Sequence, residues 1–309
     1  MGNGAVSVST AKTLSASLDD NGKANRFPWE PDRYDGWSLA ARDPEVIKEL
    51  LPLWEWFYRY YFRVQTSGWE NIPGEQVLIV GSHNGGLTAP DMVMMIYDWF
   101  RHQGLTRPVY GLTHPTAWKM NAPVAKLATQ VGSVQAHPRM AIAAFEAGAS
   151  VLVYPGGAQD VYRPFSERHK IQFAGRKGFI KVALRQEVPI VPAIAVGAHE
   201  TFFVLGDCYE QVKWLHDLGM PWLLDEDPVV FPIYLGLPWG VAFGPLPHLP
   251  IPLTMHTRIC PPIRFERYGI AAAKDREYVD ACYNLVVNRM QRELDQLVQE
   301  TTWNWGNFI

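Results

Sequence analysis

The chain has 309 residues, 48% of them hydrophobic, and a formal net charge of −3 at pH 7. This length can bury a sizeable core as one large domain, or as one domain with an appendage. The near-neutral charge gives no general attraction to nucleic acid, and no basic tract with interleaved aromatic residues supplies one locally. Three widely spaced cysteines fit a reducing compartment and predict neither a disulfide framework nor a metal site.

The N-terminal region, 1–42, is predicted to be a polar extension that precedes a domain spanning 43–309. Its first residues, MGNGAVSVSTAKTLSASLDDNGK, are small and polar and lack the apolar stretch of a signal peptide. Nowhere does the chain hold a clean run of about 20 apolar residues that would span a bilayer as a helix. We therefore expect a cytoplasmic protein that associates peripherally with a membrane.

An aromatic helix is predicted over 43–64. Asp43 and Pro44 fit the cap and the first residue of a helix, and Pro52 predicts a break or kink inside it. The run LWEWFYRYYF, 53–62, is aromatic nearly all round, so this helix is either packed in the core or laid on a membrane surface. Because Trp and Tyr are enriched at membrane interfaces, we expect this segment to contact the membrane, with core packing as the alternative.

Strand-like and helix-like runs then alternate along the chain. This order is typical of an α/β domain with a mainly parallel sheet flanked by helices. Such sheets place their functional sites at the carboxyl ends of the strands. The predicted strands are 76–80, 108–112, 131–135, 150–154 and 189–195, and the predicted helices are 91–101, 116–129, 138–147 and 177–186.

The alternation fades after Glu200. The segment 228–257 contains no Asp, Glu, Lys or Arg but has prolines throughout, which exclude a continuous helix. Since unpaired backbone does not face lipid tails, it is no transmembrane span. We expect a loop region that covers the sheet, lines an acyl pocket or dips into a membrane surface. A strand within 257–265 should return to the sheet, and 275–300 should form a long C-terminal helix.

The segment GSHNGGLTAPD, 81–91, lies between a predicted buried strand and a predicted helix. A neutral imidazole such as that of His83 can take a proton from a hydroxyl, and a carboxylate such as Asp91 can fix its tautomer and stabilise the imidazolium. Gly85 and Gly86 would let the backbone turn tightly enough to bring the two together. The alternative is that Asp91 caps the helix and His83 is an ordinary loop residue.

The segment VYPGGAQDVYRPF, 153–165, follows another predicted strand. Two glycines there allow a substrate to approach closely and expose backbone N–H groups, and Asp160 and Arg163 supply polar side chains nearby. The alternative is an ordinary glycine-rich turn. The chain has no G-x-S-x-G elbow, no phosphate-binding glycine loop and no zinc motif, so a serine hydrolase, a nucleotide-dependent enzyme and a zinc enzyme are not favoured.

Three blocks taken in order resemble the glycerolipid acyltransferase superfamily, which comprises the PlsC-like lysophospholipid acyltransferases and the related monoacyl- and diacylglycerol acyltransferases. They are GSHNGGLTAPD, VGSVQAHPRMAIAAFEAGASVLVYPGGAQD and RKGFIKVALRQEVPIVPAIAVGA, and the resemblance spans most of 45–300. It implies that His83 is the catalytic base and Asp91 the aspartate of the histidine–aspartate motif. The substrate-binding residues that it implies are Asn84, Gly85, Gly86, Pro155, Gly156, Gly157, Asp160 and Arg163.

Two features depart from the usual superfamily pattern. Seven residues separate His83 from Asp91 where four are usual, and YPGGAQD replaces F-P-E-G-T-R, so that the arginine that binds a phosphate is missing from its place. The PGG form is similar to the diacylglycerol acyltransferase branch, whose acceptor is neutral. Arg163 is the best remaining candidate to contact a phosphate.

The resemblance implies an acyltransferase that moves a fatty acyl chain from acyl-CoA or acyl carrier protein to a glycerolipid hydroxyl. The acceptor is either a lysophospholipid or an acylglycerol, and the chemistry requires neither metal nor cofactor. The expected partners are the thioester donor, the lipid acceptor and a membrane surface, but no nucleic acid. The alternatives are transfer to a non-glycerol alcohol, as in wax ester or glycolipid synthesis, and a lipid-binding protein that has lost catalysis.

Overall fold

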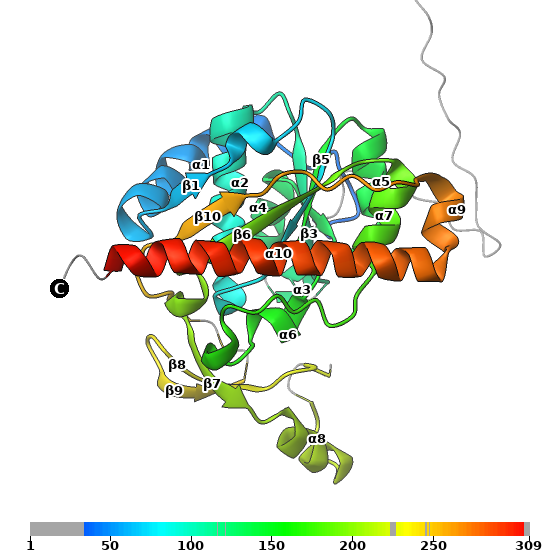
Figure 1. The fold of residues 1–309 in the computed structure, drawn as a ribbon. Coiled ribbons are helices and arrows are strands. Elements are labelled where there is room, and N and C mark those ends of the chain that lie inside the picture. Colours follow the sequence, from blue (N-terminus) through cyan, green and yellow to red (C-terminus); the bar gives the residue numbers. More distant parts are fainter. Residues whose placement is uncertain are drawn as a thin grey trace, which may run out of the picture.

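The computed structural model describes residues 34–115, 117–120, 122–222, 227–244, 246 and 248–305. A seven-stranded sheet with the order β1-β10-β6-β2-β5-β3-β4 lies at its centre (Figure 1). The five strands from β6 to β4 are parallel, β10 pairs antiparallel with β6, and β1 pairs parallel with β10. The strands are β1 (Gln65–Ser67), β2 (Leu78–Gly81), β3 (Val109–Thr113), β4 (Ser133–Gln135), β5 (Ser150–Val153), β6 (Ile190–Val196) and β10 (His256–Ile259).

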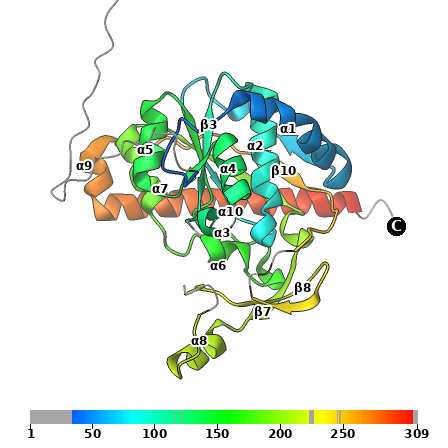
Figure 2. The ribbon, with the colours of Figure 1, turned by 180° about the vertical axis from the view of Figure 1, so that it is seen from behind.

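Helices cover both faces of this sheet, with α10 lying across one face and α1 and α2 on the other side (Figures 1 and 2). The predicted α/β architecture, with its long C-terminal helix, is therefore confirmed. The helices of this layer structure are α1 (Pro44–Trp56), α2 (Pro90–Gln103), α3 (Ala117–Met120), α4 (Ala122–Gln130), α5 (Pro138–Glu146), α6 (Gly157–Val161), α7 (Gly178–Gln186), α9 (Gly269–Lys274) and α10 (Arg276–Trp305), and the short helical turns are η2 (Trp69–Asn71), η3 (Gly86–Thr88), η4 (Phe165–Glu167) and η5 (His199–Thr201).

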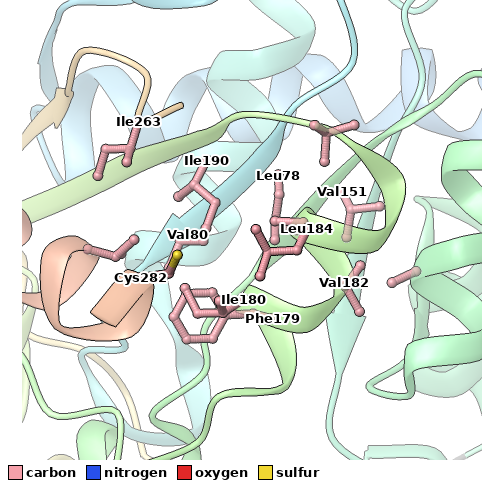
Figure 3. Close-up of a cluster of buried hydrophobic side chains, with 14 of the residues drawn as sticks. Leu78, Val80, Val151, Phe179, Ile180, Val182, Leu184, Ile190, Ile263 and Cys282 are labelled. Atoms are coloured by element: carbon pink, nitrogen blue, oxygen red, sulfur yellow. The ribbon is translucent and has the colours of Figure 1, made fainter. Parts of the chain in front are cut away.

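The alternation of side chains along each strand divides the core in two. Leu78 and Val80 point towards α5, α7 and α10, where they pack with Ile180 and Cys282 (Figure 3). Ile79, which lies between them on the strand, points to the other face and packs beneath α1 and α2. Strands that are buried on both faces read as continuous apolar runs, which is why their positions could be predicted well.

The aromatic N-terminal segment forms α1 and then a π-helical turn, η1 (Phe57–Tyr61). Asp43 caps α1 as expected by accepting a hydrogen bond from the N–H of Glu45. Of the break or kink predicted at Pro52, the break is wrong, because α1 continues through this residue. Trp54 stacks on Phe100 of α2. Such tertiary contacts hold the last turn of α1 although the proline lacks one helical hydrogen bond.

Side chains of this segment divide between the core and the surface. Tyr58 and Phe62 are buried against α2, whereas Leu53, Trp56 and Tyr60 are exposed. Core packing, the alternative to membrane contact, therefore accounts for one side of the segment. Within the described part of the chain, no helix is both long and apolar enough to cross a bilayer.

The region after η5 builds a second, antiparallel sheet with the order β7-β8-β9. The prediction that 228–257 is a loop region is wrong, because this segment contains the hairpin of β8 and β9. Pro232 is the first residue of β8, a position where a strand tolerates proline. This small sheet and the helix α8 project from the main domain on the side away from α1 (Figures 1 and 2). The elements are β7 (Phe203–Asp207), α8 (Tyr209–Asp217), β8 (Pro232–Gly236) and β9 (Gly240–Phe243).

Candidate active site

The turn from β2 into α2 carries His83 at the carboxyl end of a central strand. Gly85 and Gly86 both adopt positive φ, at 76° and 63°, and η3 tightens the turn before α2 begins. A Cβ atom on Gly85 would lie 2.5 Å from Cδ of Pro90, and one on Gly86 would lie 2.4 Å from Cε1 of His248. The two glycines are therefore required by the backbone conformation and by close packing.

His83 and Asp91 are brought together as the sequence predicted. His83 Nδ1 lies 3.8 Å from Asp91 Oδ1, and the His83 side chain keeps 19% of its surface exposed against 3% for that of Asp91. Nδ1 is buried and has no hydrogen-bond partner among the described residues. A shift of about 1 Å would make the contact a hydrogen bond. Asp91 is the second residue of α2 and not its cap.

Two protein donors hold the Asp91 carboxylate in place. Oδ1 accepts a hydrogen bond of 2.8 Å from the Met92 N–H, and Oδ2 accepts one of 3.1 Å from the side-chain amide of Asn84. Asn84 belongs to the turn and Met92 to the first turn of α2. The extra residues between His83 and Asp91 are accommodated by η3, so the unusual spacing still brings the carboxylate to the imidazole.

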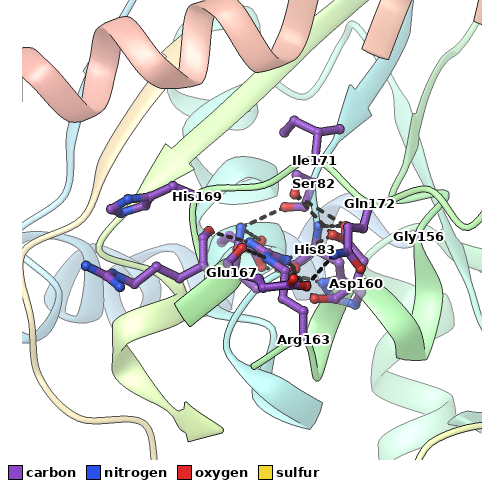
Figure 4. A network of polar contacts seen from close by, with 12 residues as sticks. Ser82, His83, Gly156, Asp160, Arg163, Glu167, His169, Ile171 and Gln172 are labelled. Carbon is purple, nitrogen blue, oxygen red and sulfur yellow. Dashed lines mark hydrogen bonds and ion pairs between the residues drawn. The ribbon is translucent and has the colours of Figure 1, made fainter. Parts of the chain in front are cut away.

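The Asp160 carboxylate lies directly beneath His83 and is fully buried (Figure 4). Its Oδ2 accepts a hydrogen bond of 2.5 Å from the His83 backbone N–H, and the Ser82 hydroxyl lies 3.3 Å from the same oxygen. Burial raises the pKa of Asp160 to about 6, although the Arg163 guanidinium and the His83 N–H act in the opposite direction. Asp160 is thus an anchor for the backbone at His83.

Arg163 is 2% exposed, and its guanidinium donates only to groups of the protein itself. Nη1 donates to the His83 carbonyl at 2.8 Å and to Asp160 Oδ1 at 2.9 Å, and Nη2 donates to the side-chain carbonyl of Asn84. Nη2 also donates to the carbonyl of Arg168, and Nε to that of Glu167. The predicted contact of Arg163 with an acceptor phosphate is therefore wrong, because its donors are used and it is shielded from solvent.

The same correction applies to other predicted substrate contacts. Asn84 is 1% exposed, and Asp160 is fully buried, so neither side chain offers a surface to a ligand. Gly85 and Gly86 are also buried. These residues shape and hold the turn that carries His83 and Asp91.

The glycine pair after β5 lies beside this network. Pro155 and Gly156 are buried, and a Cβ atom on Gly156 would come within 2.2 Å of Cβ of Asp160. Gly157 is partly exposed and starts α6 with a φ of 54°. The exposed Arg176 donates a hydrogen bond of 2.5 Å to the Gly156 carbonyl. Of the predicted residues Pro155, Gly156 and Gly157, only Gly157 is accessible to a ligand.

Two residues beside this turn were not among the predicted site residues. The Tyr154 ring lies 5.1 Å from the His83 ring, centroid to centroid, and burial raises the pKa of its hydroxyl well above the ordinary value. His248 Nε2 lies 3.1 Å from the Gly85 carbonyl oxygen, and its ring is stacked on Phe202. Tyr154 lies within the block 153–165 that the sequence singled out, but His248 follows β9, and no local pattern connects it with 81–91.

Comparison with known proteins places the chain in a family. The sequence model of a family described as "Diacylglycerol acyltransferase" matches residues 40–297. The chain belongs to this diacylglycerol acyltransferase family. The superfamily expected from the three sequence blocks is thereby confirmed.

Individual relatives of this diacylglycerol acyltransferase family member are distant. An uncharacterized protein of Mycobacterium tuberculosis, Rv0502, is 29% identical over 65% of this chain and 57% of its own length. A chicken (Gallus gallus) protein named "DGAT1/2-independent enzyme synthesizing storage lipids" is 28% identical over 61% of this chain and 56% of its own length. The chain thus spans less than two thirds of the length of these relatives.

A solved structure, the 1-acyl-sn-glycerophosphate acyltransferase PlsC from Thermotoga maritima, matches over 81% of this chain and 80% of that one, with a TM-score of 0.46 and 16% identity.

The described residues include no group of three or more His, Cys, Asp and Glu side chains placed to hold a metal ion.

Proposed function

We propose that the protein transfers a fatty acyl chain from an acyl thioester to a hydroxyl of a glycerolipid, with His83 as general base. The observation that carries this proposal is the pairing of the partly exposed His83 with the buried Asp91 carboxylate at the carboxyl edge of the sheet. His83 would take the proton of the acceptor hydroxyl while the oxygen of that hydroxyl attacks the thioester carbonyl carbon. The new C–O bond forms, the C–S bond breaks, and the proton passes to the departing thiolate.

Asp91 would stabilise the imidazolium that forms during this step. Its carboxylate is held by Met92 and Asn84 at 3.8 Å from Nδ1, the ring nitrogen that has no other partner among the described residues. Catalytic hydrogen bonds are often long without substrate and shorten once it binds. Because Asp160 and Arg163 bind the N–H and C=O of His83, the backbone that carries the base cannot move freely.

The favoured acceptor is a neutral acylglycerol. Arg163 is the arginine closest in sequence to the glycine-rich block. It is buried and donates its hydrogen bonds to His83 and Asp160, so it is not available to a phosphate. The name of the chicken relative, which refers to the synthesis of storage lipids, supports this direction. The donor would be acyl-CoA or acyl carrier protein, and the acceptor would be reached from one side of a membrane.

The test is thiol release from acyl-CoA in the presence of one acceptor at a time. Monoacylglycerol and diacylglycerol should support release well above the rate without acceptor, and lysophosphatidate should offer no advantage over them. A strict requirement for a phosphate in the acceptor would reject the neutral class. Release with a long-chain alcohol alone would move the enzyme to wax ester synthesis, and release with none of these would contradict the proposal.

A further inference from the structure

The outward face of the small sheet is apolar and exposed. Tyr234 and Ala242 point inward, whereas Leu235 and Val241, directly opposite each other on β8 and β9, point outward with 48% and 59% exposure. Ile233 and Phe243 form the next outward pair, and Phe243 is 56% exposed. Antiparallel sheets that face water normally carry polar side chains on that side. This face therefore lacks the composition of a solvated surface.

The helix α8 adds to the same projecting part. None of its residues is buried, and Trp214 is 62% and Leu215 41% exposed. Just after it, Leu218 is 67% exposed. An amphipathic helix that packs its apolar side on no core is typical of proteins that lie on a lipid interface.

The inward face of the small sheet connects this surface to the active site. Tyr234 and Ala242 pack with Val161 of α6, the helix that also carries Asp160. His248, shortly after β9, fills the space beside Gly86 in the turn that holds His83. One packed cluster thus joins the small sheet to the catalytic turn.

We infer that the outward face of β7, β8 and β9 together with α8 docks on a lipid surface of uncharged or zwitterionic headgroups. This inference rests on the proposed function, because that function requires a lipid acceptor. Residues 228–257 contain no Asp, Glu, Lys or Arg, and the charged residues of β7 and α8 are Asp207, Glu210, Lys213 and Asp217, which are acidic on balance. Such a surface lacks the cluster of cations that attracts anionic lipid.

Other occupants fit the surface less well. The N-terminal stretch, 1–33, is rich in small and polar residues and offers few side chains that could cover an apolar sheet. The exposed side chains of Trp56, the last residue of α1, and Tyr60 of η1 belong to the N-terminal aromatic segment and not to the small sheet. A second copy of the chain remains as the competing occupant, and the experiment distinguishes it.

The test is co-sedimentation of the full chain with phosphatidylcholine vesicles. Leu235→Ser combined with Val241→Ser should lower vesicle partitioning by at least about tenfold, because both side chains would leave the lipid interface. The matched control, Trp56→Ser with Tyr60→Ser, removes similarly exposed side chains from the end of α1 and from η1 and should bind like the wild type. Adding phosphatidylglycerol to the vesicles should not increase binding. Both double variants should keep the wild-type melting temperature.

Three results would overturn the inference. The first is unchanged binding of the Leu235 and Val241 variant, and the second is a loss of binding confined to the Trp56 and Tyr60 control. The third is a wild-type dimer that the Leu235 and Val241 variant converts to monomer in light scattering. His83→Ala should bind vesicles normally, so a failure of the proposed chemistry would be seen separately as absent thiol release with intact lipid binding.

Discussion

Replacement of Gly86 by alanine tests how tightly the catalytic turn is packed. The new Cβ would lie 2.4 Å from Cε1 of His248 and 3.1 Å from Cδ1 of Phe202, at a φ of 63°. The left-handed conformation costs an L-residue about 1–2 kcal/mol. Overpacking of a buried site adds about 1–3 kcal/mol. We therefore expect Gly86→Ala to lower the free energy of unfolding by about 2–5 kcal/mol and to reduce thiol release.

The control for this variant is Gly148→Ala. Gly148 has a φ of 82°, but a Cβ atom added there would meet no other atom within 4 Å, so only the conformational cost of about 1–2 kcal/mol applies. Denaturant unfolding measures both variants, and His248→Ala in the Gly86→Ala background should recover the part of the loss that is due to the clash. If Gly86→Ala is no less stable than Gly148→Ala, the result would contradict the close packing of His248 against Gly86.

Two further predictions concern the network beneath His83. Arg163→Ala should destabilise the fold by about 3–5 kcal/mol in denaturant unfolding, because it leaves the buried Asp160 carboxylate unpaired; a stable variant that has lost only the use of phosphate-bearing acceptors would contradict this. Because burial raises the pKa of Asp160 from 3.8 to about 6, the folded protein holds this proton more tightly than the unfolded chain does, so the contribution of Asp160 to stability should be lost as the pH rises from about 4 to about 6. Asp160→Asn should flatten that part of the stability profile, and an unchanged slope would refute the assignment.

The central strands and the base could be located from sequence because their signals are local. Val80 and Val191 lie in runs that are apolar throughout, as strands buried on both faces require, and His83 follows such a strand directly. The carboxyl edge of a parallel sheet is the usual place for a site. These features need no knowledge of distant contacts.

The role of Arg163 could not be read from sequence because it depends on which side of a loop is interior. Arg163 follows Asp160 by three residues, just beyond the end of α6, and either an outward or an inward orientation satisfies that spacing. The structure turns the guanidinium inward because the carbonyls of His83 and Arg168 and the Asp160 carboxylate converge there. These acceptors come from segments up to 80 residues away.

The small sheet escaped prediction for a different reason. A high density of prolines suggested loops, but Pro232 opens β8 and Pro238 lies in the turn between β8 and β9, where neither interrupts a strand. The position of each proline within an element matters more than their number. Likewise, contact between His248 and Gly86 brings together residues that are 162 positions apart, which no local motif could reveal.

The most direct test of the central claim is the acyl-transfer rate of His83→Ala, measured as thiol release from acyl-CoA with the best neutral acceptor. We predict a loss of at least about 10²-fold, as expected when a general base is removed, with an unchanged melting temperature. His102→Ala, an exposed histidine at the far end of α2, should retain the wild-type rate, and Asp91→Asn should lose less than His83→Ala. Near-normal turnover by a folded His83→Ala protein would contradict the assignment of His83 as the base.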